Sequence, residues 1–222
     1  MPYKKRTKKN YRQRKMQITK QISGPASKTQ MTKLVFSEQI SLDPGVGLTA
    51  NSTYNAGGCY DPRTALGGNQ PRGFDQWMAF YEHYVVLGSK ISVTFQTTGL
   101  QPSDGNGIVG ILLKANSANE VNNIPQLVEL ANTRYKAIGP VGGYNSTCTV
   151  SSRYSAKRFL GRASPLSDPE LKGDLNSNPT ESAYYELVVG PSNNGDNLGA
   201  VRALIRIEYI VAFIEPKPLG QS

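Results

Sequence analysis

The chain has 222 residues, 38% of them hydrophobic, with 22 glycines and 14 prolines. This composition excludes collagen, coiled coils and disulfide-rich scaffolds, and it leaves enough apolar side chains for a core. The net charge is +9, from 25 basic and 16 acidic residues. Because no apolar run reaches the roughly 18 residues of a membrane-spanning helix, and no secretory signal is recognisable, we expect no membrane insertion.

The positive charge is concentrated at the N-terminus. Eleven of the 25 basic residues precede the first acidic residue, Glu38, and the remainder holds 14 basic and 16 acidic residues, a net charge of −2. Blocks of like charge repel one another, stay unstructured and usually contact polyanions. Residues 1–32 also contain few large apolar side chains. We therefore predict a disordered basic arm over residues 1–32 and a globular domain over residues 33–222.

We expect this arm to bind nucleic acid through the phosphate backbone, because it contains no motif that reads bases. Tyr3 and Tyr11 lie among the charges, where they can stack on exposed bases. The patch Lys5-Arg-Thr-Lys8 also suits recognition by a nuclear import receptor. The predicted nucleic-acid-binding residues are Lys4, Lys5, Arg6, Lys8, Lys9, Arg12, Arg14, Lys15 and Lys20.

The elements expected after the arm are mostly strands. Apolar residues that alternate or run continuously predict strands over 33–42, 84–96, 108–114, 134–138, 147–153, 183–189 and 201–214. Helix is favoured only over 124–130 and where aromatic residues recur at helical spacing: Phe74, Trp77, Phe80, Tyr81 and Tyr84. We expect these five rings to pack a short helix against the core, and stacking on bases is the alternative. Long loops are expected over 51–73, 99–107 and 161–178. Seven or eight short strands with long connections predict an all-β fold, a single antiparallel jelly-roll sandwich.

Few residue patterns suggest catalysis, a cofactor or a metal. Gly105-Asn-Gly-Ile-Val-Gly110 matches GxGxxG, but no helix is expected after it, so a loop leading into a strand is the better interpretation. His83 is the only histidine, and we expect it to be packed or at an interface. Asp168, Glu170 and Asp174 match no Ca²⁺ loop spacing and are expected to be solvated. We predict no enzyme activity, no cofactor and no bound metal.

The two cysteines, Cys59 and Cys148, form no CxxC pair and have no metal-ligand spacing. Two buried thiols in a reducing compartment are the favoured interpretation, and a disulfide between them is the alternative.

Two segments of the chain are distinctive. The first runs from Pro71-Arg-Gly-Phe-Asp-Gln-Trp77 through Tyr84-Val-Val-Leu-Gly-Ser-Lys-Ile-Ser-Val-Thr-Phe95, and the second is Arg206-Ile-Glu-Tyr-Ile-Val-Ala-Phe-Ile-Glu-Pro216. Together with the basic arm, they resemble the capsid proteins of circovirus-like viruses with small circular single-stranded DNA genomes. The arms of circoviruses themselves are denser in arginine, whereas this arm is rich in lysine.

The resemblance implies a single jelly roll that assembles with copies of itself into a small icosahedral shell. It also implies an inward-facing arm that packages the single-stranded DNA genome and acts as a nuclear localisation signal, so that the protein is found in the virion and, during assembly, in the host nucleus. The alternatives are a cellular nucleic-acid-binding structural protein with a basic extension and the coat protein of a small RNA virus. A third alternative, a sandwich enzyme or lectin, would need catalytic or ligand-binding residues, and only His83 and the 168–174 loop offer them.

Overall fold

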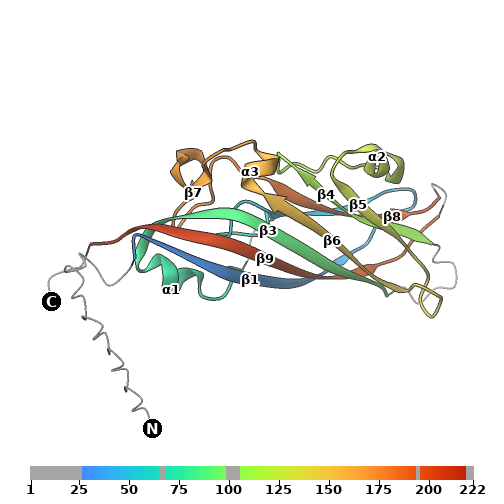
Figure 1. Cartoon of the computed structure of the whole chain (residues 1–222). Helices are drawn as coiled ribbons and strands as arrows, with labels where there is room; N and C mark the ends of the chain where they lie inside the picture. Colours follow the sequence, from blue (N-terminus) through green and yellow to red (C-terminus); the bar gives the residue numbers. More distant parts are fainter. Residues whose placement is uncertain (1–26, 66–68, 99–105, 194–195, 219–222) are drawn as a thin grey trace, which may run out of the picture.

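A computed structural model of the chain describes residues 27–65, 69–98, 106–193 and 196–218 (Figure 1). The predicted nucleic-acid-binding residues lie outside the described residues, as does Gly105 of the glycine motif: Lys4, Lys5, Arg6, Lys8, Lys9, Arg12, Arg14, Lys15 and Lys20.

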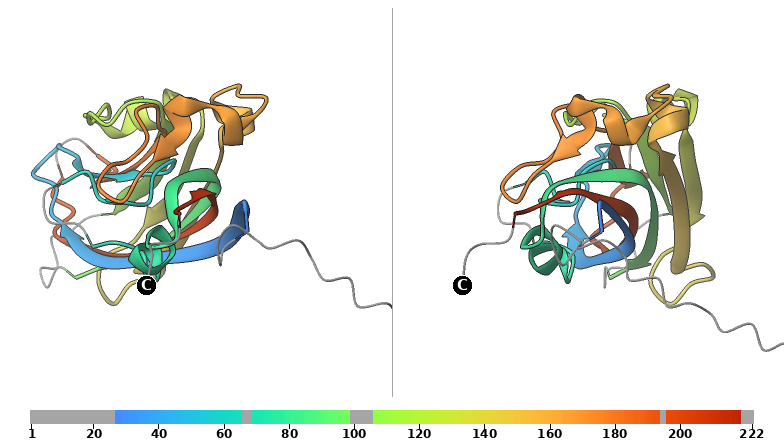
Figure 2. Two further views of the ribbon diagram at one scale, coloured as in Figure 1. Left: turned by 90° about the vertical axis from the view of Figure 1, so that its left-hand side faces the viewer. Right: turned by 60° about the vertical axis from the view of Figure 1, so that its left-hand side comes forward.

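Two antiparallel sheets pack face to face (Figures 1 and 2). The first has the order β1-β9-β3-β6, with the two-residue β7 also pairing with β3, and the second has the order β2-β8-β4-β5. Apart from β7, these are the two four-stranded sheets of a jelly roll, so the predicted fold class is confirmed. The strands are β1 (Thr29–Leu42), β2 (Ala50–Asn55), β3 (Tyr81–Thr97), β4 (Gly107–Lys114), β5 (Thr133–Ile138), β6 (Thr147–Ser155), β7 (Lys172–Gly173), β8 (Tyr184–Pro191) and β9 (Val201–Pro216).

The core lies between the sheets and is built from alternate residues of each strand. Along β9, Ile205, Ile207 and Tyr209 are fully buried, whereas Arg206 between them points to solvent. Burying an apolar side chain of this size contributes about 1.5–3 kcal/mol, so the long alternating strands supply much of the stability. Along β3, Ile91, Val93 and Phe95 are fully buried in the same alternating way.

The first strand begins earlier than expected, at Thr29 rather than at residue 33. Thr29 lies opposite Ile214 and Thr32 opposite Val211, so residues 29–32 belong to the ladder with β9 and not to the arm. This stretch has few apolar side chains, and it is held in the sheet by backbone pairing with the apolar end of β9.

The predicted loop over 51–73 includes all of strand β2 except Ala50, and the one over 161–178 contains β7. The polar side chains of β2 find partners inside the protein: the Thr53 hydroxyl donates to Asn119 Oδ1 at 3.0 Å, and the Ser182 hydroxyl donates to Asn55 Oδ1 at 2.5 Å. Because burial of a polar group is tolerated when it is hydrogen-bonded, hydropathy alone gives no indication of this strand.

The helices are short. Helix α1 (Phe74–Met78) ends before Tyr81 and Tyr84, which lie in β3, so the expected helical stripe is wrong beyond Met78. Helix α2 (Ile124–Glu129) confirms the second prediction, and α3 (Ala156–Phe159) was not expected. Two 3₁₀ turns, η1 (Pro165–Ser167) and η2 (Pro169–Leu171), complete the described structure. None of the described helices has the length and hydrophobicity needed to cross a membrane.

Candidate nucleic-acid and assembly surfaces

The arm joins the body where the first and last strands meet. The Tyr81 hydroxyl donates to the backbone oxygen of Ser27 at 3.0 Å, and the Tyr81 ring packs against Phe213 with ring centres 5.9 Å apart. Trp77 of α1 stacks on the same Phe213 at 5.6 Å. Stacked aromatic pairs are stabilising beyond the area they bury, so this cluster fixes the point at which the chain leaves the arm and enters β1.

The aromatic stripe was expected to pack in the core. Phe74, Tyr81 and Tyr84 do so, whereas Trp77 is half-buried and Phe80 is 50% exposed. The Tyr84 hydroxyl donates to Asn178 Oδ1 at 3.0 Å, and burial raises the Tyr84 pKa well above its usual value. Four of the five rings therefore stabilise the body, and Phe80 alone is presented to solvent.

His83 lies in a partly exposed cluster of charges. Its Nδ1 is 2.7 Å from Glu215 Oε2, and Lys172 pairs with the other oxygen of the same carboxylate. Hydrogen bonds from Lys172 and His83 lower the Glu215 pKa. His83 is half-buried, with 39% of its side chain exposed, so it is only partly packed in the single chain; its expected position at an interface stays a prediction.

The predicted acidic loop does not gather its carboxylates into one site. Asp168 and Glu170 contact the Arg162 guanidinium at 3.3 and 2.6 Å, where Glu181 joins them. Asp174 lies apart and accepts a hydrogen bond of 2.7 Å from a backbone N–H, which lowers its pKa. Across the described residues, no group of three or more metal-ligating side chains is placed to hold an ion.

Both cysteines are free thiols: Cys59 is fully buried, and Cys148 in β6 is half-buried. Burial raises the pKa of each thiol, and at Cys148 the positive charge of Lys136 partly offsets the increase. The two thiols therefore differ in how accessible they are to a reagent, and neither is made more reactive by a lowered pKa.

We expect a thiol reagent such as Ellman's reagent to modify one cysteine of the folded protein, Cys148, and to modify Cys59 only after unfolding. The number of protein thiols that react, measured with and without urea, tests this. Cys148→Ser is the control, and in the folded state it should show no fast reaction. Equal rates for both thiols in the folded protein would contradict the buried position of Cys59.

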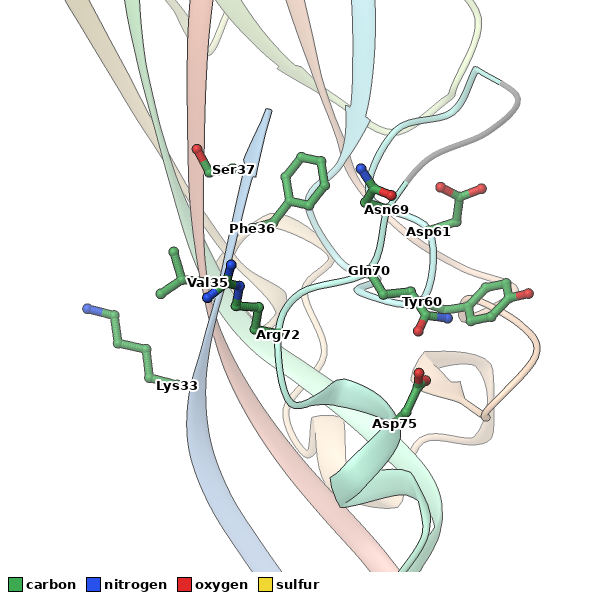
Figure 3. A pocket seen from close by; sticks show the side chains of 10 residues that line it. All are labelled: Lys33, Val35, Phe36, Ser37, Tyr60, Asp61, Asn69, Gln70, Arg72 and Asp75. Atoms are coloured by element: carbon green, nitrogen blue, oxygen red, sulfur yellow. The ribbon is translucent and has the colours of Figure 1, made fainter. Parts of the chain in front are cut away.

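A groove of about 1090 Å³ runs beside β1 (Figure 3). Lys33 and Arg72 line it together with Asp61 and Asp75, so its charges balance. Burial raises the Asp61 pKa, and the nearby Glu38 carboxylate adds to the effect. A phosphate backbone needs an excess of positive charge, which this groove does not have.

A buried ion pair holds the segment that follows β4. Lys114 Nζ is 2.5 Å from Glu186 Oε2, and the two side chains are 4% and 0% exposed. The backbone N–H groups of Glu120 and Val121 donate to the same carboxylate at 3.1 and 3.3 Å. Sequence reasoning missed this pair, because a lysine at the end of an apolar strand is usually solvated.

No protein-family model matches the sequence, and no curated protein matches it either. Among solved structures, the chain is similar to Desmodium yellow mottle tymovirus (13% identity, TM-score 0.41, covering 89% of this chain and 95% of that one). It is also similar to the decameric BFDV capsid protein (12%, 0.44, 83% and 99%). A third match is a semi-empty particle of the Macrobrachium rosenbergii nodavirus (11%, 0.44, 89% and 100%). All three TM-scores are below 0.5, so the fold assignment rests on strand order.

Proposed function

We propose that this chain is a viral coat protein, with a structural rather than a catalytic role. Its jelly-roll body assembles with further copies into a closed shell, and its basic arm holds the genome inside. The observation that carries the proposal is that the two segments resembling circovirus-like capsid proteins meet in the fold. Residues 71–95 include α1 and most of β3, residues 206–216 end β9, and β3 pairs with β9 over nearly its whole length.

The distribution of charge supports the same role. Each copy carries eleven positive charges before Glu38 and a net charge of −2 from Glu38 onward. Closed shells repeat the same contacts between copies, and a nearly neutral body avoids strong repulsion across them. The arm charges are then free to neutralise phosphates.

The genome we propose is single-stranded DNA, on the basis of the resemblance, and the coat protein of an RNA virus is the second candidate. The arm patch Lys5-Arg-Thr-Lys8 is proposed to bind a host nuclear import receptor, which would bring the protein to the nucleus for assembly. The mature protein would then reside in the virion.

We expect sedimentation velocity of the full-length protein, read at 260 and 280 nm, to show a megadalton particle with strong absorbance at 260 nm. The nucleic acid extracted from it should be degraded by DNase and resist RNase. RNA in the particle would favour the RNA-virus candidate. A monomer or dimer at both low and high salt would contradict the coat function and favour a cellular nucleic-acid-binding protein.

A further inference from the structure

Two hollows lie along the seam between the two sheets, and a third adjoins them over β1, β3, β6 and β9 of the first sheet. The seam lies where β6, an edge strand of the first sheet, runs beside β5, an edge strand of the second, with α3 packed near the end of β6 (Figures 1 and 2). The hollows have volumes of about 390, 410 and 480 Å³, and Arg153 lines all three. Arg153 therefore lies at the point where the three hollows adjoin.

The seam is strongly basic. Its cations, here called the basic seam, lie on four elements, and four of the five line the hollows: Lys90, Arg134, Lys136, Arg153 and Arg158. The acidic residue at the hollows, Glu208, is already bound by Lys33 and Arg206. None of the five cations forms an ion pair with another described residue.

Two of these cations are placed against each other. Lys90 of β3 and Arg153 of β6 are directly opposite in the antiparallel ladder. Like charges directly opposite each other in a ladder destabilise a sheet. An anion bound between them removes the repulsion, which makes this pair a place where a phosphate would gain affinity.

The hollow nearest α3 adds aromatic rings to the positive charge. Arg153 and Arg158 line it together with Tyr154 and Phe159, whose rings meet edge to face at 6.1 Å. Phe159 is half-buried, so part of its ring is accessible. Positive charge that follows a backbone, beside rings on which bases stack, is the pattern of single-strand nucleic-acid binding.

We propose that the basic seam is a second nucleic-acid contact, located on the folded body. It holds the phosphates of a single-stranded segment whose bases pack against Phe159. This inference rests on the proposed function, because the arm would supply the nucleic acid. The basic seam differs in charge from the groove beside β1, where two cations and two carboxylates balance.

The test compares two full-length variants that lose the same charge. Seam variant R134Q/R153Q/R158Q removes three seam cations, and control variant R72Q/R202Q/K217Q removes three cations elsewhere that have no ion pair among the described residues. Binding of a fluorescent 20-nucleotide single strand is measured against salt. Because each single-strand phosphate contact contributes a slope of about −0.7, the seam variant should lose about 2 from the slope and the control almost nothing.

Cross-linking a bromouracil-substituted strand to the wild-type protein locates the contact, and we expect a cross-linked peptide that contains Phe159. Equal slopes for the two variants, or cross-links confined to residues 1–26, would overturn the seam proposal and leave the coat function standing. A heparin fragment that shows the same seam dependence, without base cross-links at the seam, would overturn the assignment to nucleic acid. If the full-length protein binds no single strand at all, the proposed genome binding itself fails.

Discussion

Replacing the nine predicted arm residues with glutamine is expected to weaken binding of the full-length protein to single-stranded nucleic acid by at least about 1000-fold at low salt. Nine contacts at about −0.7 each give a salt slope near −6, so affinity falls by roughly 10³–10⁴ between 50 and 200 mM salt. The variant should lose this slope and keep only the weaker contribution of the basic seam. Fluorescence anisotropy titrations at several salt concentrations measure both quantities.

The matched control is an arm with the same composition in a scrambled order. Because the arm is expected to contact phosphates and not bases, the scrambled protein should bind as tightly as the wild type. The thermal midpoint of the body should stay unchanged in both variants, since the first ladder pair is formed by Thr29. Tight, salt-sensitive binding by the glutamine variant would contradict the assignment of genome binding to the arm.

Lys114→Met is expected to lower the free energy of unfolding by about 3–5 kcal/mol, because it leaves the Glu186 carboxylate buried without its countercharge. For a domain of this size each kcal/mol corresponds to about 2–4 °C, so the melting temperature should fall by roughly 6–20 °C. Urea denaturation and thermal melting at a fixed protein concentration measure the change.

Two variants separate the effect of burial from that of charge. Lys33 pairs with Glu208 at the surface, where the lysine side chain is 56% exposed, so Lys33→Met should cost less than about 1 kcal/mol. The double variant K114M/E186Q keeps an acceptor for Glu120 and Val121 but has no unpaired charge, and it should regain most of the lost stability. A Lys114→Met protein as stable as Lys33→Met would show that the Glu186 environment relaxes to admit water.

The parts of the fold that the sequence predicts are those in which hydropathy determines burial. Residues along β9 alternate between core and solvent, and the alternation of apolar and polar residues in the sequence already indicates which of them face the core. Strand β2 could not be found in this way, because Thr53 and Asn55 are buried through hydrogen bonds to residues far away in the sequence. The aromatic stripe was misleading because Tyr81 and Tyr84 reach the core from an irregular part of β3, close to the register shift between Val86 and Gly88.

The two candidate surfaces also differ in how far the sequence alone reveals them. The arm is recognisable because its charges are consecutive in the sequence, whereas the basic seam draws Lys90, Arg134 and Arg153 from three separate strands. Only the packing of β5 beside β6 brings these cations together. Similarly, Lys114 and Glu186 are 72 residues apart, and nothing local to either one indicates a partner.

The pairing of β1 with β9 also sets the timing of folding in the cell. Thr29 lies opposite Ile214, so the ladder that completes the first sheet joins residues separated by 214 − 29 = 185 positions. At roughly 5–20 residues per second, a ribosome needs about 10–40 s to synthesise that interval. Contacts this distant also close slowly, so the first sheet forms only after β9 has been synthesised. The cationic arm thus leaves the ribosome tens of seconds before the body to which it is joined can fold.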